Sequence, residues 1–193
     1  MKYTRAFFLF LMVPFSAYTQ ESSWMNKLVP DFVQMQYAGN IGLASGGIGY
    51  TLHKDLIQIS LLNGYTPAAI AGKSVNTIAL RGTFDVVRVP INNVSIIGYV
   101  GLGCNFETSG RSFYTSLPER YPKKYHNLSA VHATAALGGR IHLPLGEREG
   151  QGLDLYGETG TLDTYMYYYF KNKNLSLTHL FSAALGLRYH FGR

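Results

Sequence analysis

The chain has little charge and almost no cysteine. Asp, Glu, Lys and Arg make up 15% of its 193 residues, whereas soluble domains average roughly 25%. Cys104 is the single cysteine, so the chain cannot form an internal disulfide. Beyond the N-terminal segment, no stretch approaches the roughly 20 apolar residues of a membrane-spanning helix. These absences exclude a disulfide-stapled domain and disfavour a helical membrane protein.

The N-terminal segment has the pattern of a secretory signal peptide. Two basic residues precede an apolar run that is too short for a membrane anchor, and small residues follow it: Lys2, Arg5, Ala6–Phe15, Ala17 and Thr19. We therefore expect residues 1–19 to be removed and residues 20–193 to form one domain. Loss of the two basic residues lowers the formal charge of +6 by two. The remaining mild basicity suits anionic lipid headgroups, and we expect no nucleic-acid partner.

Glycine and aromatic residues are abundant, with 21 Gly, 15 Tyr and 11 Phe. Along most of the chain, apolar residues alternate with small or polar ones, which is typical of strands with two different faces. Near the C-terminus, Leu185, Leu187 and Phe191 share one face, while Gly186 and Arg188 share the other. The same alternation predicts about eight strands, at 33–43, 46–52, 56–65, 75–86, 94–106, 129–142, 153–161 and 177–191.

A closed antiparallel transmembrane β-barrel satisfies this pattern, because each strand needs only its lipid-facing residues to be apolar. The connections alternate in length: residues 53–55, 90–93 and 146–151 are short, whereas 67–74, 107–128 and 162–175 are longer. This alternation predicts short periplasmic turns and longer extracellular loops. The turn of the first hairpin, within the Gly-rich residues 39–49, is not located by the pattern. A soluble β-sandwich or lipocalin-like barrel is the alternative, but its water-facing surface would carry more charge.

The final residues add a resemblance. Ala184–Phe191 resembles the terminal strand of outer-membrane barrels, which the barrel-assembly machinery recognises by its alternating apolar residues and its near-terminal aromatic. In that class the aromatic is usually the last residue, whereas here Gly192 and Arg193 follow it. The mature chain resembles the small eight-stranded outer-membrane proteins of the OmpA/OmpX-like class. The resemblance implies a location in the outer membrane, among its lipids and lipopolysaccharide.

The predicted inner face carries a cluster of charged side chains, namely Arg81, Asp85, Arg140, Asp154, Glu158 and Arg188. We expect Glu158 to lie between Arg140 and Arg188 on adjacent strands. Because the interior of an eight-stranded barrel is just wide enough for side chains to fill it, a plug of paired charges is the favoured interpretation. A narrow path for small solutes, as in a porin-like channel, or a ligand site is the alternative.

The longest loop predicts a second candidate site. It interleaves cations with aromatic rings, which suits sugars and phosphates: Arg111, Tyr114, Arg120, Tyr121, Lys123, Lys124 and Tyr125. Lipopolysaccharide, a glycan or a partner protein are the ligands expected there. The aromatic run Tyr165–Phe170 is interpreted as an outer aromatic girdle.

Catalysis is not expected, although lipid A deacylases share this architecture and carry a His-x-Ser pair with a nearby Glu. The nearest match here is His132-Ala133-Thr134, without an acid at a convincing position, and His179 and Ser182 face opposite sides of one strand. His132 and His142 lie too far apart along a strand to share a metal. We therefore expect no metal and no cofactor, and we predict a non-enzymatic protein with an envelope-structural or surface-interaction role.

Overall fold

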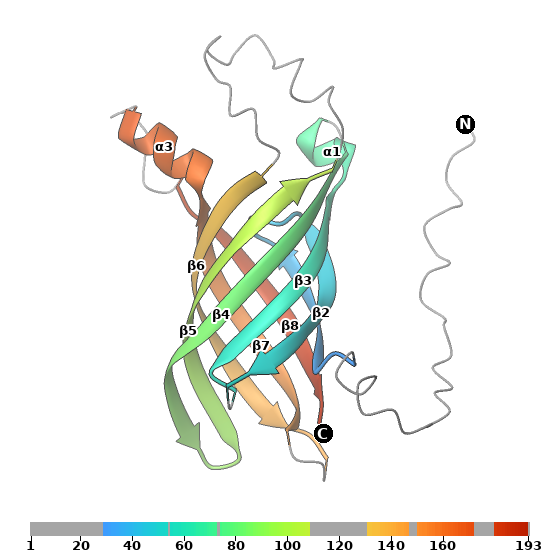
Figure 1. Cartoon of the computed structure of the whole chain (residues 1–193), viewed down its shortest axis with the longest axis vertical. Coiled ribbons are helices and arrows are strands. Elements are labelled where there is room, and N and C mark those ends of the chain that lie inside the picture. Colours follow the sequence, from blue (N-terminus) through green and yellow to red (C-terminus); the bar gives the residue numbers. More distant parts are fainter. Residues whose placement is uncertain are drawn as a thin grey trace, which may run out of the picture.

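The computed structural model describes residues 29–53, 55–72, 74–108, 131–146, 150–171 and 180–192. Eight antiparallel strands form a closed barrel in sequence order, and β1 pairs with β8 to close it (Figure 1). The strands are β1 (Phe32–Ala38), β2 (Ala44–Leu52), β3 (Ile57–Thr66), β4 (Val75–Ile91), β5 (Val94–Glu107), β6 (Val131–Pro144), β7 (Gln151–Leu162) and β8 (Ser182–Phe191). The predicted fold class, an all-β closed barrel, is confirmed.

The barrel is apolar outside and polar inside. In β1, Val33, Met35 and Tyr37 are exposed, while Gln34 and Gln36 between them are buried. The other strands also turn most of their large apolar side chains outward, with buried exceptions such as Leu62 and Ile97, and the free thiol of Cys104 faces outward as well. A soluble barrel has the reverse arrangement, with its apolar side chains inside, so this pattern is that of a transmembrane β-barrel.

The two ends of the barrel differ. The turn end carries the short β2–β3, β4–β5 and β6–β7 connections together with the start of β1 and the end of β8, and the loop end carries the remaining connections (Figure 1). Among the described residues, the helices α1 (Ala68–Ala71) and α3 (Asp163–Lys171) lie at the loop end. Within the described residues, neither helix is long and apolar enough to cross a membrane.

The first hairpin corrects one sequence-based expectation. β1 ends at Ala38, and residues 39–43 turn the chain at the loop end. Positive φ angles at Ala38 (61°) and Gly39 (91°) end the extended backbone, and the Ala38 amide donates to the Leu43 carbonyl at 2.8 Å. Ile41 and Leu43 therefore do not continue an outward strand face; Ile41 is 5% exposed and lies in an inner apolar cluster with Leu62 and Ala79. This loop-end connection is short, so the expected length asymmetry does not extend to it.

Other predicted strand ends also differ from the observed ones. β4 continues through Pro90 to Ile91, and its register shifts at a bulge between Asp85 and Val87. The turn therefore occupies only residues 92–93, where Asn92 has a φ of 53°. β8 begins at Ser182 rather than 177, and residues 177–179 of the predicted strand lie outside the described part of the chain. The aromatic run 165–170 belongs to α3.

Close approach between strands explains part of the high glycine content. Gly138 of β6 pairs with Tyr99 of β5, and Gly186 of β8 pairs with Tyr156 of β7. A Cβ atom at either glycine would clash with the phenol ring of its partner. The two tyrosine rings therefore lie inside the barrel over strands that have no side chain at that position, and both are 3% exposed.

Candidate functional site

All six predicted lumen charges face the interior of the barrel, on strands β4, β6, β7 and β8. Arg81, Arg140, Asp154 and Arg188 are each no more than 7% exposed. The side chains of Glu158 and Asp85 are 7% and 2% exposed. The structure therefore gathers the predicted cluster, but several of its contacts differ from the expected ones.

Glu158 binds Arg81 across the lumen rather than the arginines of the adjacent strands. Arg81 donates to both carboxylate oxygens of Glu158, with a Nη1–Oε1 distance of 2.7 Å, and the Tyr99 hydroxyl donates to Oε2 at 2.9 Å. β4 and β7 are not paired strands, so this ion pair spans the interior. The expectation that Glu158 lies between Arg140 and Arg188 was wrong, because its cross-strand neighbours are Gly138 and Ala184.

The other two arginines share one amide. Arg140 donates to Asp85 Oδ2 at 2.6 Å and to Gln58 Oε1 at 3.2 Å. Arg188 donates to the same Gln58 oxygen and, through Nε, to Gln34 at 3.0 Å. Within the described residues Arg188 forms no ion pair, and its guanidinium lies 4.4 Å from the centre of the Phe32 ring. Gln34, Gln58 and Tyr99 belong to this network although the sequence prediction did not include them.

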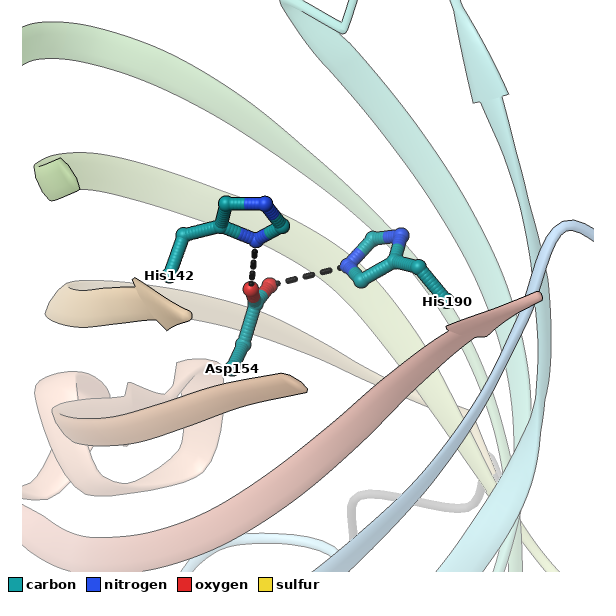
Figure 2. Close-up of side chains that lie close together, drawn as sticks. All are labelled: His142, Asp154 and His190. Carbon is teal, nitrogen blue, oxygen red and sulfur yellow. Dashed lines mark hydrogen bonds and ion pairs between the residues drawn. The ribbon is translucent and has the colours of Figure 1, made fainter. Parts of the chain in front are cut away.

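A histidine–aspartate–histidine cluster lies near the turn end (Figure 2). His142 Nδ1 is 2.6 Å from Asp154 Oδ1, and His190 Nε2 is 3.0 Å from Asp154 Oδ2. The three residues come from β6, β7 and β8, which are consecutive strands. Alternation placed all three on the inner face, but grouping them requires the strand register, in which His142 faces Asp154 and His190 faces Gly152.

These contacts divide the lumen into separate spaces. A cavity of about 20 Å³ is lined by Arg81 and Glu158 and, toward the loop end, by Asn40 and Ser182. A cavity of about 80 Å³ lies on the turn-end side, beside Arg140 and the histidine cluster. A wider hollow of about 440 Å³ opens at the loop end, lined in part by Ile41 and His132. The ion pairs thus occupy the middle of the barrel between its two ends.

Comparison with known proteins adds likenesses of fold. No protein-family model matches the chain, and no curated protein matches its sequence. Two solved structures resemble it: the de novo designed TMB2.3, and the N-terminal β-barrel domain of Pseudomonas aeruginosa OprF. The designed protein is 13% identical to this chain with a TM-score of 0.42, and the match covers 85% of this chain and 97% of the designed protein. The OprF domain is 14% identical to this chain with a TM-score of 0.42, and the match covers 84% of this chain and 98% of the OprF domain. The fold assignment above rests on the strand pairing of this chain itself.

At the loop end, His132 contacts α3 rather than Thr134. Its Nδ1 atom lies 3.0 Å from the Thr164 hydroxyl and 3.3 Å from Asp163 Oδ1. Both contacts use one nitrogen, so the acid and the hydroxyl do not lie on opposite sides of the ring, as an acid–base–nucleophile relay requires. The described contacts of His132 are therefore with the start of α3, and its hydroxyl partner is Thr164.

Asp163 is the titratable group that ties α3 to the barrel. Partial burial acts to raise its pKa. Hydrogen bonds from the Thr164 hydroxyl and from the backbone of Ala133 and Thr164, together with the nearby His132, outweigh burial and hold the pKa below its usual value. The carboxylate is therefore the stable form at neutral pH.

The second predicted site, the basic and aromatic loop from Arg111 to Tyr125, lies outside the described residues. Its role as a binding surface stays a prediction from the sequence.

Proposed function

We propose that this protein is an integral outer-membrane β-barrel of a Gram-negative envelope. The apolar outer face and the polar, charged interior support insertion in a bilayer. The signal-peptide pattern of residues 1–19 and the terminal strand support export and assembly at the outer membrane. In this orientation the turn end faces the periplasm and the loop end faces outward.

Within that membrane, we propose a non-enzymatic role in envelope structure or surface interaction, with a lumen that does not conduct. The ion-paired network supports this proposal most directly. Arg81–Glu158 and Arg140–Asp85 bond side chains of non-adjacent strands across the interior. Separating such pairs to admit an ion would leave buried charges uncompensated, which costs several kcal/mol.

The proposed interaction surface is the loop between β5 and β6, toward lipopolysaccharide. Arg111, Arg120, Lys123 and Lys124 supply four cations that can bind phosphate groups of its lipid anchor. Loops on a rigid scaffold commonly carry such functions. A glycan or protein ligand would use the same aromatic and basic side chains.

Conductance in planar lipid bilayers tests the sealed lumen. We expect the inserted wild-type barrel to leave the current at the level of the lipid alone. A variant that removes both transverse pairs together, Arg81→Ala, Glu158→Ala, Arg140→Ala and Asp85→Ala, should show measurable cation or anion current.

The control is the heat-dependent gel mobility of each folded barrel, which shows that the variant has inserted and closed. A steady wild-type current would contradict the sealed lumen and favour a narrow channel for small solutes.

A further inference from the structure

The histidine–aspartate–histidine cluster has the composition of a transition-metal site. Two imidazole nitrogens and one carboxylate oxygen, from His142, His190 and Asp154, lie within 4.8 Å of one another. Two histidines and a carboxylate are an established ligand set for Zn²⁺ when a further position is left to water. Figure 2 shows both rings directed at the Asp154 carboxylate, with His142 at one oxygen and His190 at the other.

Distances in the cluster are close to those that a bound ion needs. Ligand atoms about 2.0–2.1 Å from a tetrahedral metal lie about 3.3 Å from each other. The nitrogen–oxygen distances of 2.6 Å, from His142 to Asp154 Oδ1, and 3.0 Å, from His190 to Asp154 Oδ2, would have to widen by about 0.7 and 0.3 Å to reach that separation. Binding through His142 Nδ1 and His190 Nε2 requires each imidazole to leave that nitrogen free of hydrogen and to carry a proton only on its other nitrogen.

The surroundings hold the ligands in place. The His142 ring lies over Gly152, where a Cβ atom would clash with it. The His190 ring packs on Phe32 with ring centres 5.3 Å apart, and it meets the His142 ring edge-on at 5.7 Å. Asp154 is 1% exposed. A metal site needs ligands fixed in this way by their neighbours.

Electrostatics both permit and limit the site. Arg140 Nη2 is 2.6 Å from Asp85, whereas its Nε is 3.4 Å from Asp154, so the nearest partners of Asp154 are the two imidazoles. Arg188 faces Asp154 across the β7–β8 pair, and Arg88 lines the adjacent cavity. Arg140, Arg188 and Arg88 all oppose a bound dication, and they predict an affinity weaker than that of a closed structural zinc site.

The cluster is accessible from the turn end. His142, Asp154 and His190 line the cavity of about 80 Å³, which has room for a water ligand. On its other side, His190 borders a hollow of about 400 Å³ formed with Asp31, Thr51 and Gly192. An ion entering at this end reaches the ligands without passing the ion pairs of the central lumen.

We propose that His142, Asp154 and His190 form a binding site for a divalent transition-metal ion of the Zn²⁺ class at the turn end of the barrel. The proposal concerns this site alone and holds whether or not the lumen conducts. A bound ion would join β6, β7 and β8 near the seam where the barrel closes.

Zn²⁺ titration of the tag-free folded barrel in detergent, followed by calorimetry, tests the site. We expect one Zn²⁺ per chain, an affinity for Mg²⁺ and Ca²⁺ that is far lower, and an unfolding temperature that rises with Zn²⁺ concentration. Because removal even of groups behind the ligands commonly weakens metal binding by about 10–100-fold, we expect at least a tenfold loss in His142→Ala and in His190→Ala.

Two further variants separate a built site from adventitious binding. Gly152→Ala should weaken Zn²⁺ binding by displacing the His142 ring, although it removes no ligand. Arg88→Ala should strengthen binding, because it removes an opposing charge from the cavity. His132→Ala, at the loop end, is the matched control and should bind as the wild type does.

Electron paramagnetic resonance with Cu²⁺ supplies an independent readout. We expect hyperfine coupling to two nitrogens in the wild type and to one in His190→Ala. Absence of stoichiometric Zn²⁺ binding by the folded wild type would overturn the proposal, and so would unchanged binding in a folded His142→Ala, His190→Ala double variant. Gel mobility before and after heating confirms that each variant is folded.

Discussion

Loss of Glu158 should destabilise the barrel strongly. It accepts hydrogen bonds from Arg81 and Tyr99, and the Arg81 side chain is 9% exposed. Glu158→Ala leaves that guanidinium buried and uncompensated, so we expect the free energy of unfolding to fall by about 3–5 kcal/mol. Equilibrium urea unfolding in lipid vesicles measures the difference.

The matched control is Arg88→Ala. Arg88 pairs with Asp85 at 3.2 Å, but its side chain is 46% exposed and Asp85 keeps its pair with Arg140. We expect a loss below about 1 kcal/mol. Equal losses in the two variants would show that the Arg81–Glu158 pair is not a buried, stabilising contact.

At this scale the sequence predicted which way side chains point but not which atoms they meet. Alternation assigned Arg81, Glu158 and Arg188 correctly to the interior, because successive side chains of a strand point to opposite faces of the sheet. Partner choice depends on register and on reach across the lumen. Arg81 therefore bonds a residue 77 positions away on a non-adjacent strand, and no local pattern encodes that.

Among the elements, α3 is held to the barrel by its first residue. Asp163 accepts hydrogen bonds from the Thr164 amide at 2.6 Å and from the Thr164 hydroxyl at 3.0 Å. Since its pKa in the folded protein is lowered, its contribution is complete above the unfolded value of about 3.9 and is lost as pH falls through the folded value.

We therefore expect the stabilising contribution of Asp163 to the start of α3 to be lost below about pH 4. The chemical shift of the Thr164 amide, followed by NMR in micelles, reports the transition. In Asp163→Asn the transition should be absent, and α1, which has no acidic residue in its first turn, should not respond in either protein. A transition that persists in Asp163→Asn would assign it to another group.

The strands were more predictable than the connections. Strand alternation extends over many residues, so eight strands were recognised with end errors of a few positions. The turn at residues 39–43 depends on the positive φ angles of Ala38 and Gly39, and alanine gives no signal of such a conformation. The bulge between Asp85 and Val87 interrupts the alternation of faces, so the sequence pattern ended β4 before the strand itself ends.

For the whole molecule, the proposed function requires that lipid surrounds the apolar outer face of the barrel. Leu137 lies near the middle of β6, pairs with Val100 and Thr159, and is 62% exposed. If lipid surrounds it, Leu137→Arg should destabilise the barrel by about 2–4 kcal/mol, as arginine does near a bilayer midplane. Reversible folding into lipid vesicles, measured by urea titration, gives the value.

Ile91→Arg is the control at the turn end, where β4 finishes and the side chain is 49% exposed. Near the interface such a change costs only about 0–1 kcal/mol. A depth-independent cost for the two substitutions would argue against the proposed position in the membrane.

The pairing of tyrosine rings with glycines has a consequence for folding. Tyr99 lies over Gly138, and the inner-face neighbours of that glycine along β6 are Ala136 and Arg140. A slip of β5 against β6 by two residues would preserve every apolar and polar face, but it would press the ring against a methyl group or a guanidinium. The Tyr99 ring and Gly138 therefore help to set the register of the β5–β6 pair. They disfavour misaligned hairpins that the alternation of apolar and polar residues alone would allow.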